Sequence, residues 1–174
     1  MFNTGHFYSS PPETIDPNVF TFNTLVGFVI PASHAFATTP TLQPIYLYYS
    51  PSGVDHFISP DPLITSKFQG WANDGGSFHA YLTQQPGSVP VYEFYNGPGA
   101  DHYDSTNQLE VNGIPGWNVN GIKFYAYTTQ VPGTVPIYLF YSVNGVDHYQ
   151  SPDPNAVNGY SGWSNYGVSF YAFP

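Results

Sequence analysis

The chain repeats one unit of 46 residues, and this repeat constrains its fold more than any other feature. The last copy, Pro136 to Pro174, contains every element of the unit. A histidine, a tryptophan and a phenylalanine recur at this spacing: His56, His102 and His148; Trp71, Trp117 and Trp163; Phe78, Phe124 and Phe170. Such a period is typical of arrays whose units bury their apolar faces only by packing on neighbours.

The repeat predicts one domain of four tandem units, at residues 1–43, 44–89, 90–135 and 136–174. The first unit is incomplete: Gly5 to Ser9 matches Asp55 to Ser59, but the tryptophan and most of the first strand are missing. The total of 174 residues fits a single domain, since domains commonly have about 100–200 residues.

Each full unit is predicted to contain short β-strands and almost no helix. Alternation in the first strand favours a core face made of Tyr46 and Tyr48 and their equivalents Tyr92, Phe94, Tyr138 and Phe140. The Asn144-Gly145 turn indicates a hairpin, because both residues tolerate positive φ. The Asp-His strand is then its return arm, and a last strand starts at Ser77, Lys123 or Ser169. One helical turn is allowed around Leu63-Ile64-Thr65.

We therefore expect an all-β fold, with four sheets in a closed pseudo-symmetric ring such as a small β-propeller. Closure of the ring would remove free sheet edges. The alternative is a β-trefoil or β-prism, which has three units and would leave the first 43 residues as an extra partial repeat.

The charge balance argues against several partners. The chain has 2 Lys+Arg against 11 Asp+Glu and a net charge of −9. Nucleic acids and anionic surfaces would be repelled, because their binding depends on basic side chains. No apolar run approaches the roughly 20 residues that span a bilayer, so no membrane insertion is expected. Without cysteine, neither disulfides nor thiolate chemistry is available.

No motif indicates catalysis, a metal site or a cofactor. A nucleophile motif, a phosphate loop and His-Glu-x-x-His are all missing, so no catalytic residue is predicted. The Asp-His pairs allow two interpretations. His6, His56, His102 and His148 could converge on an axis to bind a metal or anion; alternatively, each histidine bonds a turn carbonyl and each aspartate completes the preceding turn. We favour the structural interpretation.

The tryptophans are the strongest candidates for ligand binding. Each follows a glycine and precedes short polar residues, and an indole beside amides and carboxylates suits stacking on a neutral sugar. The alternative is that the indoles fill the space between units. The predicted ligand-binding residues are Trp71, Asn73, Asp74, Trp117, Asn118, Asn120, Trp163 and Asn165, together with Asp55, Asp101 and Asp147 on the hairpin turns.

Three segments resemble a family of extracellular bacterial and fungal repeat domains: Val89 to Asn96, Asp101-His102-Tyr103, and Gly121 to Tyr125. The family reads roughly Val-Pro-Leu-Tyr-Arg-Phe-Tyr-Asn, Gly-Asp-His-Phe-Tyr-Thr and Tyr-Glu-Gly-Ile-Ala-Phe-Tyr-Val. It is a domain of unknown function that is often appended to secreted hydrolases or cell-surface proteins, which implies an accessory or binding role. The family arginine is Leu47, Glu93 or Leu139 here, and its glutamate before glycine is Asp74, Asn120 or Tyr166.

We expect a multivalent, lectin-like protein that binds neutral or amino sugars on glycoproteins or cell walls. The alternative is a protein-interaction module such as a protease inhibitor, using the variable loops Pro11 to Phe20, Leu63 to Gln69 and Asn107 to Pro115. The resemblance implies an extracellular location. The start of the chain lacks the features of a signal peptide, which leaves cytoplasmic storage as the alternative. The sequence does not indicate an oligomeric state.

Overall fold

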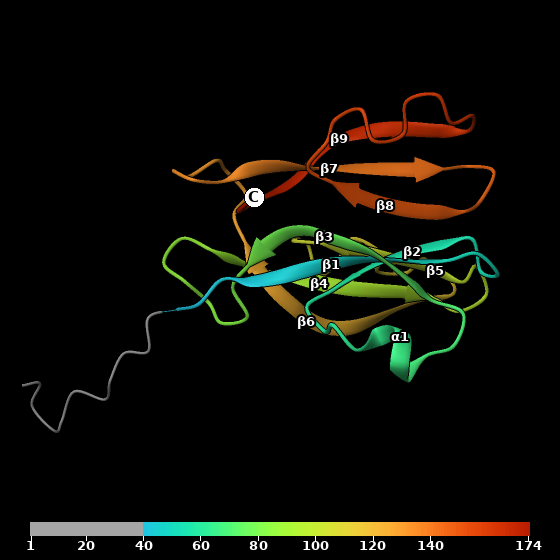
Figure 1. Cartoon of the computed structure of the whole chain (residues 1–174), viewed down its shortest axis with the longest axis horizontal. Helices are drawn as coiled ribbons and strands as arrows, with labels where there is room; N and C mark the ends of the chain where they lie inside the picture. Colours follow the sequence, from blue (N-terminus) through green and yellow to red (C-terminus); the bar gives the residue numbers. More distant parts are fainter. Residues whose placement is uncertain (1–39) are drawn as a thin grey trace, which may run out of the picture. The chain divides into compact units, whose positions relative to one another are not determined.

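The computed structural model describes residues 40–174, which fold into three small antiparallel sheets (Figure 1). The predicted first unit, residues 1–43, therefore lies outside the described residues except for its last four, and so do His6 and the loop Pro11 to Phe20. The all-β prediction is confirmed. Among residues 40–174, no closed barrel or propeller is found.

Each sheet comes from one repeat unit and has its first strand in the centre. The hairpin arm flanks that strand on one side, and the last strand of the unit flanks it on the other. The sheets are β1 (Gln43–Ser50), β2 (Asp55–Ser59) and β3 (Ala72–Ala80); β4 (Val89–Asn96), β5 (Asp101–Ser105) and β6 (Trp117–Ala126); and β7 (Val135–Ser142), β8 (Asp147–Ser151) and β9 (Trp163–Ala172). The expected helical turn is present as α1 (Ile64–Lys67).

The central strands are buried on both faces, which corrects the predicted core face. Tyr48 is buried as expected, but Tyr46 is only half-buried, whereas Ile45 on the opposite face has no exposed surface. Ile45 belongs to the common core between the sheets, and the Tyr48 hydroxyl donates to the Asp61 carbonyl in the loop of its own unit at 2.6 Å. Simple alternation predicts one buried face and misses a strand that is covered on both.

The hairpins are confirmed, but their turns differ from the predicted type. Glycine and asparagine do not supply the left-handed residue in these four-residue loops. The residue before each aspartate does, at Val54, Ala100 and Val146, with φ of 52°, 51° and 53°. Left-handed backbone is unfavourable for β-branched residues, so Val54 and Val146 hold local strain.

Every sheet contacts the other two, through equivalent strands in each case. Strands β2, β5 and β8 meet one another, and so do β3, β6 and β9. One isolated β-bridge also joins the ends of the last strands in each pair of sheets. The bridges are Tyr81 with Tyr125, Tyr127 with Tyr171, and His79 with Phe173. The described units therefore depend on one another, as the repeat predicted.

The common core lies where the three sheets meet. Phe78, Phe124 and Phe170 contribute one ring each, with centroids 5.7–5.8 Å apart and edge-to-face angles of 67–69°. No ring is more than 2% exposed. Edge-to-face contacts bring the positive ring edge to the negative ring face, which adds to the energy of burial.

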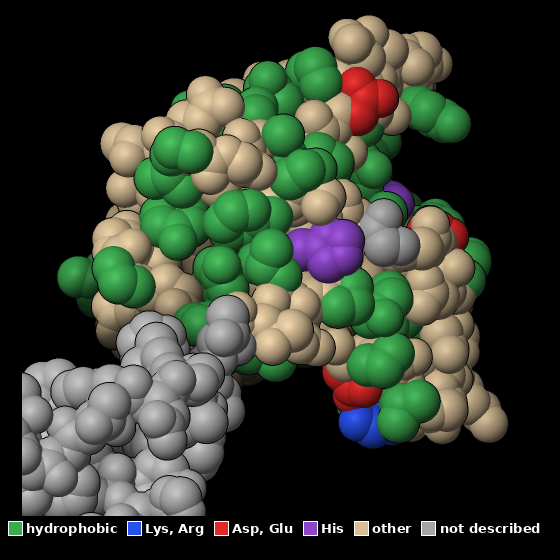
Figure 2. Space-filling view, turned by 60° about the vertical axis from the view of Figure 1, so that its left-hand side comes forward, with side chains coloured by type: hydrophobic (Ala, Val, Ile, Leu, Met, Phe, Trp, Pro, Cys, Tyr) green, Lys and Arg blue, Asp and Glu red, His purple; other side chains and the backbone are tan. Residues whose placement is uncertain are grey.

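The surface is poor in charge. On the face drawn in Figure 2, hydrophobic side chains are widespread and charged side chains are few. Among the described residues, the structure contains no helix with the length and apolar character needed to cross a membrane.

Replacement of one core phenylalanine should destabilise the whole assembly. We expect Phe124→Ala to lower the free energy of unfolding by about 3–5 kcal/mol, because a fully buried ring leaves a cavity behind. Phe78→Ala and Phe170→Ala should match it within error, since the three rings have equivalent surroundings. Chemical denaturation followed by tryptophan fluorescence measures this. Phe68→Ala is the control, since Phe68 is 56% exposed; an equal loss in that variant would contradict the assigned core.

Candidate functional site

The Gly-Trp pairs place each indole at the start of the last strand of its unit. The glycines before the tryptophans have positive φ, a backbone conformation that residues with a side chain rarely adopt. The φ angles are 89° at Gly70, 90° at Gly116 and 87° at Gly162. A Cβ at Gly162 would also clash with the Asn144 side chain of the hairpin loop. Trp117 and Trp163 begin β6 and β9, and Trp71 immediately precedes β3. The last strands thus begin earlier than the predicted starts at Ser77, Lys123 and Ser169.

Each tryptophan packs against the histidine of a neighbouring unit. The Trp163 and His56 rings are 5.8 Å apart, and the other two pairs are Trp71 with His102 at 5.7 Å and Trp117 with His148 at 5.8 Å. All three contacts are edge-to-face, and all three indoles are half-buried. The indoles thus contribute both to the boundary between units and to the surface. Their predicted contact with a sugar stays a prediction.

Asp-His links join the units beneath the indoles. The carboxylate of Asp147 accepts from the His56 backbone N–H at 2.9 Å and from the ring Nδ1–H at 2.7 Å. The same pair of bonds runs from His102 to Asp55 and from His148 to Asp101. Each of these three histidines therefore bonds an aspartate of another unit through Nδ1, and not a turn carbonyl, which corrects the interpretation based on the sequence.

The three aspartates lie close together in the interior. Asp55, Asp101 and Asp147 are at most 3% exposed, and one carboxylate oxygen from each lies within 4.8 Å of the others. Among the described residues these are the side chains that together could hold a metal ion. Both oxygens of each carboxylate already accept from a histidine, so their clear role is to link the sheets. Their predicted contact with a ligand stays a prediction.

A groove of about 570 Å³ opens where the third sheet meets the first. Tryptophan and tyrosine rings form much of its wall, and Tyr160 is 70% exposed. Polar groups line it as well. The residues that define this feature, which we call the Trp163 groove, are Trp163, Tyr160, Tyr149, Tyr49, Asp74 and Asn144. Rings beside carboxylate and amide groups in a shallow site can hold a sugar or a small polar ligand.

The sequence identified only part of this groove. Trp163, Asp74 and Asp147 line it as candidates, whereas Tyr160 and Asn144 were missed because they lie in segments that differ between units. Asn73 and Asn165 use their side-chain oxygens to accept from the N–H of Gly75 and Gly167 at 2.7 Å. These two amides therefore shape strand bulges. Asn118 is exposed in β6.

Trp117 lines a second, smaller groove of about 210 Å³. Its other wall is the variable loop of the second unit, including Leu109 and Ile114, which are 69% and 51% exposed. Asn120, a further candidate, donates to Glu93 Oε1 at 2.6 Å and so is engaged with its own sheet. The three tryptophans thus make the same contact with a histidine of a neighbouring unit, but the residues around each indole differ.

The second unit carries a buried charge network that its siblings lack. Lys123 Nζ lies 2.9 Å from Glu93 Oε2 and 2.8 Å from Asp104 Oδ1, and it sits 4.2 Å from the centre of the Phe57 ring. Asp104 Oδ1 has this ionic contact but no hydrogen bond among the described residues. Burial raises the pKa of Asp104 to about 6, against the lowering effect of Lys123.

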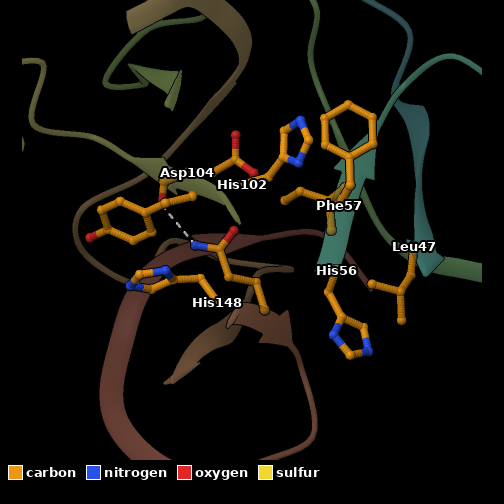
Figure 3. Close-up of a pocket in the computed structure, with 9 residues that line it drawn as sticks. Leu47, His56, Phe57, His102, Asp104 and His148 are labelled. Carbon is orange, nitrogen blue, oxygen red and sulfur yellow. Dashed lines mark hydrogen bonds between the residues drawn. The ribbon is translucent and has the colours of Figure 1, made fainter. Parts of the chain in front are cut away.

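Asp104 also borders a cavity of about 10 Å³ (Figure 3). Residues of all three sheets surround it, including Leu47, Phe57 and His148. Gln150 Nε2 crosses from the third unit to donate to the Asp104 carbonyl at 2.9 Å. This volume is about that of one water molecule, so the cavity has no room for a sugar.

The pKa of Asp104 predicts a pH dependence of stability. Its pKa rises from 3.8 to about 6 on folding, so the folded state favours the protonated acid. This contribution is fully present below about pH 4 and is lost as the pH rises through about 6, at most about 3 kcal/mol. Urea denaturation across this pH range should therefore show Asp104→Asn gaining stability relative to the wild type as the pH rises. Asp61→Asn is the control: the bonds to Lys67 and Leu63 lower the pKa of Asp61, so this variant should show the opposite trend. A constant difference between Asp104→Asn and the wild type would contradict the assignment.

A family model described as a domain of unknown function, DUF5648, matches residues 3–114 and again residues 44–173. The second match begins about one unit after the first, as expected for a chain of tandem repeats. No curated protein and no solved structure matches the chain. Because the family model covers most of the sequence, the chain belongs to the DUF5648 family of domains of unknown function.

Proposed function

We propose that this protein is a multivalent carbohydrate-binding protein with shallow sites at the boundaries between its sheets. The observation that carries the proposal is the Trp163 groove, in which a half-buried indole and the exposed Tyr160 ring lie beside Asp74 and Asn144. Aromatic rings offer apolar area for the C–H face of a sugar, and the carboxylate and amide can bond its hydroxyls.

The repeat supports several sites rather than one. The Trp-His contact recurs at all three boundaries with nearly equal distances, and Trp117 lines a groove of its own. We infer that the three complete units close around one axis, since each sheet contacts both others. Weak sites held in fixed geometry gain avidity of about 10²–10⁴ on a surface that carries many copies of the ligand.

Loss of the indoles should reduce binding step by step. We expect Trp163→Ala to lower binding to immobilised glycans, and Trp71→Ala and Trp117→Ala to add to that loss, because each removes one stacking surface. The free energy of unfolding of each variant should fall by less than the roughly 3–5 kcal/mol that is typical when a fully buried aromatic residue is replaced by alanine. The reason is that part of each indole is already exposed. Glycan arrays measure binding, and thermal melts of the same samples measure stability.

Two results would decide against the proposal. The first is a wild-type protein that binds no neutral or amino glycan on the array. The second is full binding by the triple tryptophan variant with its fold intact by circular dichroism. Phe68→Ala serves as the matched control, because it removes an exposed aromatic ring outside the Trp163 groove.

A protein-interaction role is the second candidate, and the exposed apolar loops favour it. Leu63 and Phe68 are both 56% exposed beside α1, and Leu109 and Ile114 project from the corresponding loop of the second unit. Variable loops on a rigid β scaffold are a common arrangement in inhibitors. Sub-micromolar inhibition of a cysteine or serine protease, lost in Leu109→Asp but retained in Trp163→Ala, would support this role over carbohydrate binding.

A further inference from the structure

We propose that the Trp163 groove binds a protonated amine, so that its ligand class is a glycan with free amino groups. This inference rests on the proposed carbohydrate-binding function and narrows it from neutral and amino sugars to the cationic members.

Asp74 supplies a negative charge without a basic partner. The whole chain has two lysines and no arginine. Lys67 pairs with Asp61, and Lys123 pairs with Glu93 and Asp104. Both basic side chains are therefore committed elsewhere, and within residues 40–174 no ion pair involves Asp74. An exposed carboxylate beside a groove can attract a cation that is bound there.

A second carboxylate, that of Asp153, does not line the groove, but its charge acts on Tyr149, which does. Burial is the main cause that raises the pKa of Tyr149, and the charges of Asp153 and Asp74 raise it further. Both carboxylates thus lie near the Tyr149 ring that lines the groove. His56 also lines the groove, but its Nδ1 is bonded to Asp147. The local field therefore disfavours acidic sugars and favours an ammonium group.

The aromatic walls suit the same ligand. Trp163, Tyr160 and Tyr49 line one groove with Asp74. The faces of indole and phenol rings attract cations, including at exposed sites. A sugar amine can therefore sit near the carboxylate while the apolar face of the sugar contacts a ring. A neutral hydroxyl at the same place would gain less from either group.

The other two boundaries differ at the residue that carries the charge. Asn120 occupies the position of Asp74 in the second unit, and Tyr166 occupies it in the third. Glu93 beside Asn120 is already paired with Lys123. The preference for an amine is therefore assigned to one boundary of the three, and neutral sugars can still bind beside Trp71 and Trp117.

The test compares three hexasaccharides that differ in one substituent: β-1,4-linked glucosamine, N-acetylglucosamine and glucose. Titration calorimetry at mildly acidic pH, where the amine is protonated, measures each dissociation constant. We expect tightest binding to the glucosamine hexamer, and a loss of this preference at high salt because salt screens exposed charges. Asp74→Asn should weaken glucosamine binding about two- to fivefold, the range of an exposed ion pair, and leave the other two ligands unchanged.

Asp61→Asn is the matched control, because it removes one negative charge outside the groove. It should leave the dissociation constants of all three hexasaccharides unchanged. Equal binding of the three hexamers, or equal weakening of all three by Asp74→Asn, would overturn the amine preference while leaving carbohydrate binding intact. Binding of none of the three would count against both proposals. Equally tight binding of a lysine hexapeptide would show that charge alone is recognised, which would overturn the assignment to an amino sugar.

Discussion

Each three-stranded sheet of this protein depends on the other two, because none can cover its own apolar face. A sheet of three short strands exposes a side that only neighbouring sheets can bury. The core rings at Phe78, Phe124 and Phe170 show this directly, since each contacts the other two. The Asp-His links then fix how one sheet sits against the next, because two bonds from one carboxylate orient both the ring and the backbone of each histidine. Directional bonds of this kind specify a geometry that apolar contacts alone leave open.

The same Trp-His contact is surrounded by different side chains at each boundary between units. A tryptophan edge meets a histidine ring at nearly the same distance three times, which makes the arrangement a consequence of duplication. The surrounding residues differ: Leu47 and Asp74 in the first unit correspond to Glu93 and Asn120 in the second. The recurring contacts therefore set where the proposed binding sites lie, and the substitutions around them are the reason why we do not expect the same ligand at each.

Several features of the fold were predictable from short patterns. The strands, the hairpins and the turn of helix follow from proline, glycine and β-branched residues, which act on their own backbone. The errors have a common cause. The core face was predicted at Tyr46 and Tyr48 because alternation describes one buried face, while β1 is covered on both faces and also buries Ile45. The left-handed residue was placed at the Asn144-Gly145 pair, but the loop puts it at Val146. Both errors depend on how a local segment meets the rest of the chain.

The sequence by itself determined the repeat, the all-β class and the scarcity of basic side chains, because these follow from spacing and composition. It also identified the tryptophans and the Asp-His pairs as recurring features. Only the tertiary structure decided that each aspartate bonds the histidine of another unit and that Tyr160 and Asn144 share a groove with Trp163. The physical reason is that these contacts join residues distant in the chain. Their distances are set by the packing of three sheets, and no local pattern encodes them.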